Sequence, residues 1–136
     1  MSGAPSILVV EDDRFLRRAC EVSLQKRGFV VRSAVDGEAG LQMAREAAPD
    51  LILLDLLMPR VSGIELLEQL RADPATAGIR VIIMSNSSRE EDKAHASRLG
   101  VLGYYVKANL SLRALGDEVA RILGLPAPED VEKVSP

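Results

Sequence analysis

The sequence predicts one α/β domain in which helices cover a parallel sheet. Short apolar runs of strand length alternate five times with longer segments of helical periodicity. The chain has 136 residues, 47% of them apolar, which is enough to bury a core without disulfides or a structural metal. The single cysteine, Cys20, falls on an apolar helical stripe and is expected to be a small core residue.

The charge and aromatic content argue against nucleic-acid and membrane partners. Twenty acidic residues against 17 Lys and Arg give a formal charge of −3, with no tryptophan and 3% aromatic residues. A nucleic-acid groove needs phosphate neutralisation and stacking platforms. The most apolar segment, Leu51–Met58, contains Asp55 and is far shorter than the roughly 18 apolar residues of a membrane span. Residues 1–6 lack the features of a secretory signal, so we expect a cytoplasmic protein.

Five short runs, apolar and bounded by turn residues, are predicted as strands. In chain order they are Ile7–Val10, Phe29–Arg32, Leu51–Asp55, Val81–Met84 and Val101–Val106. The third is the most apolar, as expected of a strand that is covered on both faces.

The first two helices have clear start and stop signals. Asp13 can cap a helix over about residues 14–27, and Gly28 supplies a left-handed stop. The second helix follows a turn at Asp36-Gly37 and cannot continue through Pro49.

The third and fourth helices are bounded by proline, serine and glycine. The third runs from Ile64 and ends near Asp73-Pro74. For the fourth, Ser88 and Glu91 have the spacing of a capping box, and Gly100 marks the end.

The fifth helix begins after Ser111, which can cap it, and ends at Gly124. Residues 125–136 contain three prolines and mixed charge, so we predict a domain over 1–124 and a loosely ordered tail over 125–136.

Polar residues follow four of the five predicted strands. Glu11 and Asp12 come after the first, Asp55 ends the third, Ser85 follows the fourth and Lys107 follows the fifth. Because the carboxyl ends of parallel strands line one crevice, these side chains should converge. Asp55 lies between apolar runs, so it is expected to be buried, where a carboxylate without a partner is costly.

These residues resemble the receiver domain of two-component response regulators, over about residues 7–123. The resemblance rests on the acidic pair Glu11 and Asp12, the phospho-accepting position Asp55 in Leu54–Gly63, the hydroxyl Ser85, the lysine Lys107 and the aromatic Tyr104. It implies a flavodoxin-like, doubly wound sheet of five strands in the order 2-1-3-4-5 with five helices.

The chemistry of these side chains suits phosphoryl transfer. Asp55 is a carboxylate nucleophile that can form an acyl phosphate, and Lys107 and Ser85 can contact phosphoryl oxygens. Mg²⁺, the expected cofactor, is a hard cation that favours carboxylate and phosphate oxygens. The implied metal ligands are Asp12, Asp55, the backbone carbonyl of Leu57 and, through water, Glu11.

The resemblance also implies the function. A stand-alone switch would accept its phosphoryl group from a histidine kinase or a histidine phosphotransfer protein. It would not be an enzyme in its own right, although it would assist its own Mg²⁺-dependent phosphorylation and dephosphorylation. Ser85 and Tyr104 would carry the change to a downstream protein partner on the fourth helix, fifth strand and fifth helix, and a homodimer is compatible with this arrangement.

Three alternative functions share parts of this pattern. An aspartyl phosphatase would need a second acid where Leu57 stands, and a flavin carrier would need a phosphate-binding loop where acids follow the first strand. A receiver that binds partners without phosphorylation would not need every site residue. Taken one at a time, these residues also have structural interpretations: Ser85 could be a turn residue, Lys107 a surface lysine and Tyr104 an ordinary strand residue.

Two residues depart from the commonest receiver pattern. Ala108 follows the lysine where many receivers have proline, so no cis peptide is expected there. Asn86 replaces a smaller residue and would narrow access to the site. His95 lies in a polar segment and is expected to be solvent-exposed rather than a ligand.

Overall fold

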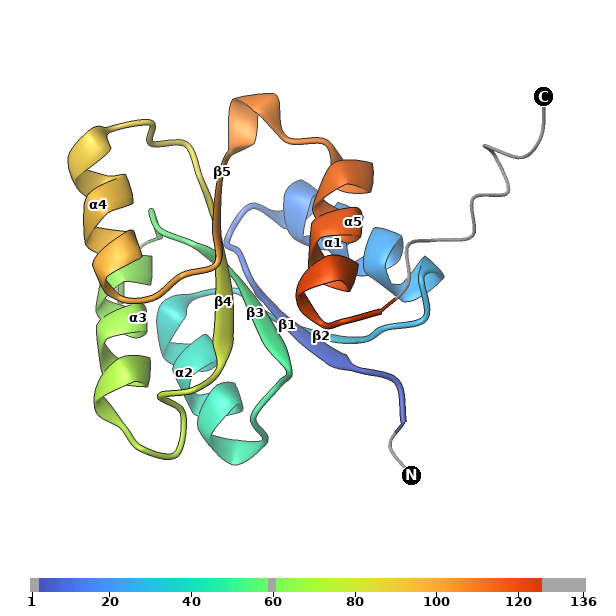
Figure 1. The fold of residues 1–136 in the computed structure, drawn as a ribbon, viewed down its shortest axis with the longest axis horizontal. Coiled ribbons are helices and arrows are strands. Elements are labelled where there is room, and N and C mark those ends of the chain that lie inside the picture. Colours follow the sequence, from blue (N-terminus) through green and yellow to red (C-terminus); the bar gives the residue numbers. More distant parts are fainter. Residues whose placement is uncertain (1–2, 59–60, 126–136) are drawn as a thin grey trace.

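The computed structural model describes residues 3–58 and 61–125 and has the predicted α/β architecture (Figure 1). Five parallel strands form one sheet in the order β2-β1-β3-β4-β5. The strands are β1 (Ser6–Val10), β2 (Val30–Ala34), β3 (Leu51–Asp55), β4 (Arg80–Ser85) and β5 (Gly103–Val106). The helices are α1 (Arg14–Lys26), α2 (Gly37–Glu46), α3 (Gly63–Ala72), α4 (Glu90–Arg98) and α5 (Leu112–Ile122), with a 3-10 turn, η1 (Lys107–Asn109), after β5.

Helices cover both faces of the sheet. Figure 1 shows α1 and α5 on one side and α2, α3 and α4 on the other. Alternate side chains of the central strands therefore enter two separate cores. All five residues of β3 are buried, so Asp55 is a carboxylate at the end of an otherwise apolar strand.

The predicted helix signals at Asp13, Ser111 and three glycines are confirmed. The Asp13 carboxylate accepts hydrogen bonds from the amides of Phe15 and Leu16. The Ser111 hydroxyl accepts one from the amide of Ala114. Positive φ angles occur at the glycines after α1, α4 and α5, which are Gly28, Gly100 and Gly124.

Two predicted strands are shifted. β2 begins at Val30 because the amide of Phe29 still bonds to the carbonyl of Leu24 at the end of α1. β5 begins at Gly103 because the amide of Val101 bonds back to Ala96 of α4. In both cases the predicted first residue of the strand bonds instead to the end of the preceding helix, although its side chain is typical of strands.

The predicted capping box at Ser88 and Glu91 is wrong. Arg89 occupies the N-cap of α4 and makes no side-chain cap bond, while its guanidinium pairs with the Glu91 carboxylate. A capping box is present instead at α3, where Ser62 and Glu65 bond reciprocally.

Some predictions concern residues outside the described ranges. Residues 126–136 of the predicted tail and Pro59 of the loop after β3 lie there. Among the described residues, none of the helices has the length and apolarity required to cross a bilayer.

Candidate functional site

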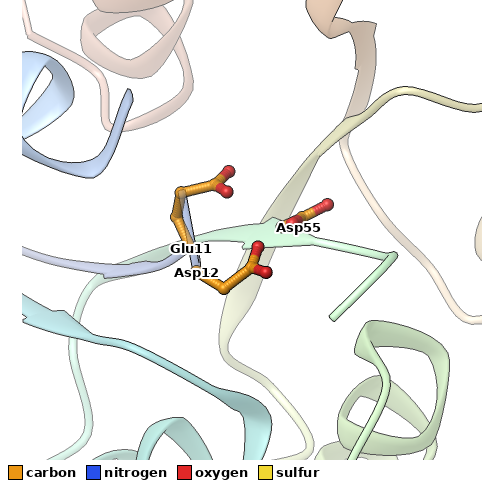
Figure 2. Close-up of side chains that lie close together, drawn as sticks. All are labelled: Glu11, Asp12 and Asp55. Atoms are coloured by element: carbon orange, nitrogen blue, oxygen red, sulfur yellow. The ribbon is translucent and has the colours of Figure 1, made fainter. Parts of the chain in front are cut away.

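Three carboxylates converge at the carboxyl edge of the sheet. Glu11 and Asp12 follow β1 and Asp55 ends β3, and one oxygen from each lies within 4.8 Å of the others (Figure 2). Glu11 and Asp55 are buried, whereas Asp12 is exposed. The sequence-predicted acidic site therefore forms, with Asp12 on its solvent side.

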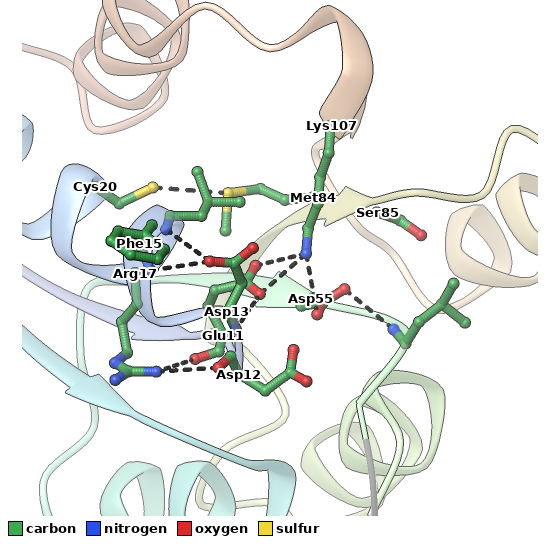
Figure 3. Close-up of polar contacts among 12 residues, drawn as sticks. Glu11, Asp12, Asp13, Phe15, Arg17, Cys20, Asp55, Met84, Ser85 and Lys107 are labelled. Carbon is green, nitrogen blue, oxygen red and sulfur yellow. Dashed lines mark hydrogen bonds and ion pairs between the residues drawn. The ribbon is translucent and has the colours of Figure 1, made fainter.

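Lys107 brings a positive charge between the two buried acids. Its ammonium lies 2.9 Å from Oε1 and 3.0 Å from Oε2 of Glu11, and 3.2 Å from Oδ2 of Asp55 (Figure 3). Burial lowers the pKa of Lys107, but the hydrogen bond to Glu11 and the charges of both acids outweigh burial and raise it overall. The lysine thus remains a cation inside the site.

The carboxyl group of Asp55 is held in an unfavourable environment for its charge. Burial, followed by the charge of Glu11, raises its pKa from 3.8 to about 7. The amide of Leu57 and the ammonium of Lys107 act in the opposite direction, and that amide donates a hydrogen bond of 3.1 Å to Oδ1. A strongly perturbed carboxyl group of this kind is typical of a functional residue.

The acidic site fits a divalent cation. Oε1 of Glu11 and Oδ2 of Asp55 are both buried, and the ammonium of Lys107 lies 2.9 Å and 3.2 Å from them. Among the described residues, these two oxygens have no donor other than that ammonium. Buried carboxylate oxygens beside a third carboxylate are the donor set that Mg²⁺ prefers.

Gly63 allows the start of α3 to pack closely against the end of β3. A Cβ on Gly63 would lie 2.2 Å from the carbonyl oxygen of Asp55 and 2.5 Å from Cα of Leu56. The amide of Gly63 also bonds to the carbonyl of Leu56 at 2.9 Å. The sequence marks this glycine only as a loop residue, whereas the structure shows that it lets the start of α3 pack directly against the main chain of Asp55 and Leu56.

Ser85 and Tyr104 are linked through Ser87, which lies two residues after the end of β4. The buried hydroxyl of Ser85 accepts a hydrogen bond from the amide of Ser87 at 3.0 Å, and the hydroxyl of Tyr104 donates to the carbonyl of Ser87 at 2.9 Å. The Ser87 hydroxyl in turn bonds to Asp92 of α4. Ser87 therefore connects the end of β4 to β5 and α4.

The remaining singled-out residues take simple positions. Cys20 is buried, and burial raises the pKa of its thiol to about 12, so it is an inert core residue. His95 is half-buried rather than freely exposed, and its Nε2 lies 3.1 Å from a Glu68 carboxylate oxygen on α3. Asn86 is exposed, and no cis peptide occurs in the described chain, as predicted for Ala108.

Comparison with known proteins identifies the family. The model of the response regulator receiver domain matches residues 7–119, and the chain belongs to this family. The protein PilH of Pseudomonas aeruginosa is 35% identical over 101 residues, which are 74% of this chain and 84% of PilH. Chemotaxis protein CheY4 of Vibrio cholerae has the same fold, with a TM-score of 0.80 and 26% identity over 89% of this chain and 99% of CheY4.

Other relatives are longer. RpaA of Synechocystis, named as a DNA-binding dual master transcriptional regulator, is 35% identical over 103 residues, 76% of this chain. The chain spans 43% of RpaA and 44% of AfsQ1 of Streptomyces coelicolor. The similarity to these proteins concerns the receiver domain.

Proposed function

We propose that this chain is a switch of a phosphorelay, phosphorylated on Asp55 by a histidine kinase or a histidine phosphotransfer protein. The observation that carries this proposal is the buried carboxyl group of Asp55, which lies beside two further acids and 3.2 Å from the ammonium of Lys107. Nucleophile, cation and acidic pocket are the parts that phosphoryl transfer to a carboxylate requires.

In the proposed reaction a carboxylate oxygen of Asp55 attacks the phosphorus atom. The bond between phosphorus and the donor's leaving group breaks, and an acyl phosphate results. The ammonium of Lys107 places a positive charge beside one phosphoryl oxygen. The hydroxyl of Ser85 donates a hydrogen bond to a second phosphoryl oxygen. The hydroxyl proton is available because the Ser85 hydroxyl acts as acceptor toward the amide of Ser87.

Mg²⁺ is the proposed cofactor. Asp12, Asp55 and the backbone carbonyl of Leu57 would hold it directly, and Glu11 through water. When bound, the ion neutralises the charge that the incoming phosphoryl group brings to an acidic pocket. The chain's own contribution is to keep the two buried acids and Lys107 in contact before the phosphoryl group arrives.

The proposed output is a change in protein contacts over α4, β5 and α5, in a protein of the cytoplasm. The hydrogen bonds from Ser85 through Ser87 to Tyr104 and α4 support this location. α4 buries only Ala96 among its residues, so it is held less firmly than α5, which buries four. A homodimer belongs to the same proposal.

The first test is phosphorylation by a small donor. The wild-type chain is incubated with acetyl phosphate and Mg²⁺, and its intact mass is measured. We expect the mass of one phosphoryl group to be gained, and no gain when Mg²⁺ is chelated before the donor is added or when Asp55 is replaced in Asp55→Asn. Asp13→Asn keeps a capping side chain and is the matched control, expected to react normally. Normal phosphorylation of Asp55→Asn would refute the assignment.

A further inference from the structure

The guanidinium of Arg17 binds the main chain of the acidic turn rather than its carboxylates. Its Nη1 donates a hydrogen bond of 2.9 Å to the carbonyl of Glu11 and lies 3.4 Å from the carbonyl of Asp12 (Figure 3). Arg17 lies in α1, whose N-cap Asp13 immediately follows these two residues. α1 therefore holds the Glu11–Asp12 turn in two ways. Its N-cap, Asp13, directly follows the turn, and its Arg17 side chain bonds to the main chain of the turn.

The side chain of Asp12 depends on this support more than that of Glu11 does. Lys107 and the amide of Asp13 fix the Glu11 carboxylate. Within residues 3–58 and 61–125, the exposed Asp12 carboxylate makes no hydrogen bond or ion pair of its own. The position of Asp12 beside Asp55 is consequently set by the main chain that Arg17 holds.

We propose that Arg17 is a positioning residue for the metal site, which keeps the Glu11–Asp12 turn in the conformation that places the Asp12 carboxylate next to Asp55. The inference deepens the proposed function, because it assigns a residue to the Mg²⁺ site on which that function depends.

The direction in which a substitution of Arg17 changes the Mg²⁺ affinity distinguishes a positioning role from a purely electrostatic effect. A cation close to the acidic pocket repels a second cation, so removing the charge of Arg17 by itself should strengthen Mg²⁺ binding. Removing the two main-chain contacts should loosen the turn and weaken binding. These two effects have opposite directions, so a single binding measurement decides between them.

The test uses Mg²⁺ alone as the probe. Because the chain contains no tryptophan, binding is followed by calorimetry and by amide NMR rather than intrinsic fluorescence. Arg17→Met keeps the aliphatic bulk but loses both contacts, and we expect its Kd for Mg²⁺ to rise about tenfold, the lower end of what groups that support metal ligands contribute. Arg17→Lys keeps the charge and can still donate to a main-chain carbonyl, so it should recover part of the loss.

Arg18→Met is the matched control. Arg18 is the next residue of the same helix, is 70% exposed and pairs with Glu21 rather than with the turn. Arg18→Met removes the same charge as Arg17→Met but no contact with the acidic turn. The Mg²⁺ affinity of this variant should therefore equal or slightly exceed that of the wild type.

Phosphorylation by acetyl phosphate gives a second readout. In Arg17→Met the Mg²⁺ concentration for half-maximal rate should rise, while the rate at saturating Mg²⁺ returns to that of the wild type. A general loss of structure would lower the rate at all Mg²⁺ concentrations. If Arg17→Met does not fold, Arg17→Lys carries the same comparison.

Three results would overturn the inference: Mg²⁺ binding by the Arg17 variants as tight as in the wild type, equal weakening by Arg18→Met, or a rate that saturating Mg²⁺ does not restore. Its failure is distinguishable from failure of the proposed function. If the wild type binds Mg²⁺ but gains no phosphoryl group, the proposed function is wrong. If the wild type is phosphorylated and Arg17→Met titrates normally, only the inference about Arg17 is wrong.

Discussion

The ammonium of Lys107 lies 3.2 Å from Oδ2 of Asp55, at the ends of two strands that are separated in the sheet by β4. The lysine side chain is 14% exposed and the aspartate side chain 1%, so this contact is an ion pair of the interior rather than of the surface. A buried charge that loses its partner is far more costly than an exposed one.

Lys107→Met should therefore destabilise the metal-free protein at neutral pH. We expect the free energy of unfolding in urea to fall by about 1–3 kcal/mol, less than the full cost of an unpaired buried charge, because one acid can take up a proton instead. Mg²⁺ should restore part of the loss by replacing the cation. Lys93 is a partly exposed lysine of α4, 4.0 Å from Glu90, so Lys93→Met should change stability little. Equal effects of the two substitutions would contradict this account.

The raised pKa of Asp55 predicts how stability depends on pH. Between its ordinary value of 3.8 and its folded value of about 7, the folded protein holds a proton that the unfolded chain has lost. Stability of the metal-free protein should accordingly fall as the pH rises from about 4 to about 7, and the contribution is fully lost above that range. Urea unfolding in chelator at a series of pH values measures this. Asp55→Asn should remove the decline, and an identical pH profile in that variant would assign it to another group.

Leu57 should set the lifetime of the phosphorylated form. Leu57 is 56% exposed beside Asp55, and its amide donates a hydrogen bond to Oδ1 of Asp55. An apolar side chain here cannot align a water for attack on the phosphoryl group, so we expect slow hydrolysis. Leu57→Asn should shorten the lifetime severalfold, measured by decay of the phosphorylated mass after the donor is removed. A decay time that is unchanged or longer would show that this side chain does not control hydrolysis.

Gly63 should be needed for the geometry of the acceptor. Gly63→Ala would place a methyl group 2.2 Å from the carbonyl oxygen of Asp55, so the junction of β3 and α3 must shift. We expect a loss of about 1–3 kcal/mol in unfolding free energy and slower phosphorylation. Gly78→Ala, where nothing lies within 4 Å of the added Cβ, should be neutral or slightly stabilising. Full activity and stability of Gly63→Ala would mean that the backbone contact adjusts freely.

Tyr104 should transmit the change at Asp55 to α4. Beryllofluoride, a mimic of the phosphoryl group, should shift the amide resonances near Asp55 and those of residues 88–112. Tyr104→Phe removes the hydrogen bond to the Ser87 carbonyl and should reduce the shifts in α4 while leaving those near Asp55. Tyr105→Phe, whose ring packs on the opposite core, is the control. Wild-type shifts confined to the surroundings of Asp55 would rule out this route.

The ring of Tyr104 is already turned inward in this structure. It packs against the core cluster that includes Ala96 of α4, and its hydroxyl donates a hydrogen bond to the carbonyl of Ser87. The carbonyl of Ser87 offers an acceptor that composition and spacing do not reveal. The proposed coupling accordingly runs through the Ser87 loop as well as through the ring.

Local features of the sequence were sufficient for the fold class and most of the site. The alternation of β-branched runs with amphipathic segments fixes a parallel sheet between two helical layers, because no other arrangement buries every apolar face. Strand-end positions brought Glu11, Asp12, Asp55 and Lys107 together, since the carboxyl ends of parallel strands share one edge. Caps at Asp13 and Ser111 were predictable because such contacts span three residues.

Contacts that no local sequence pattern specifies were decided only by the tertiary structure. Glu11 was expected as a water-mediated metal ligand, and only packing shows that its carboxylate holds Lys107 directly. In the sequence, Arg17 does not differ from the other arginines of α1. In the structure, its guanidinium lies next to the main chain of the acidic residues. Sequence pattern specifies which faces are apolar, but which donor meets which carbonyl depends on how the elements lie against one another in three dimensions.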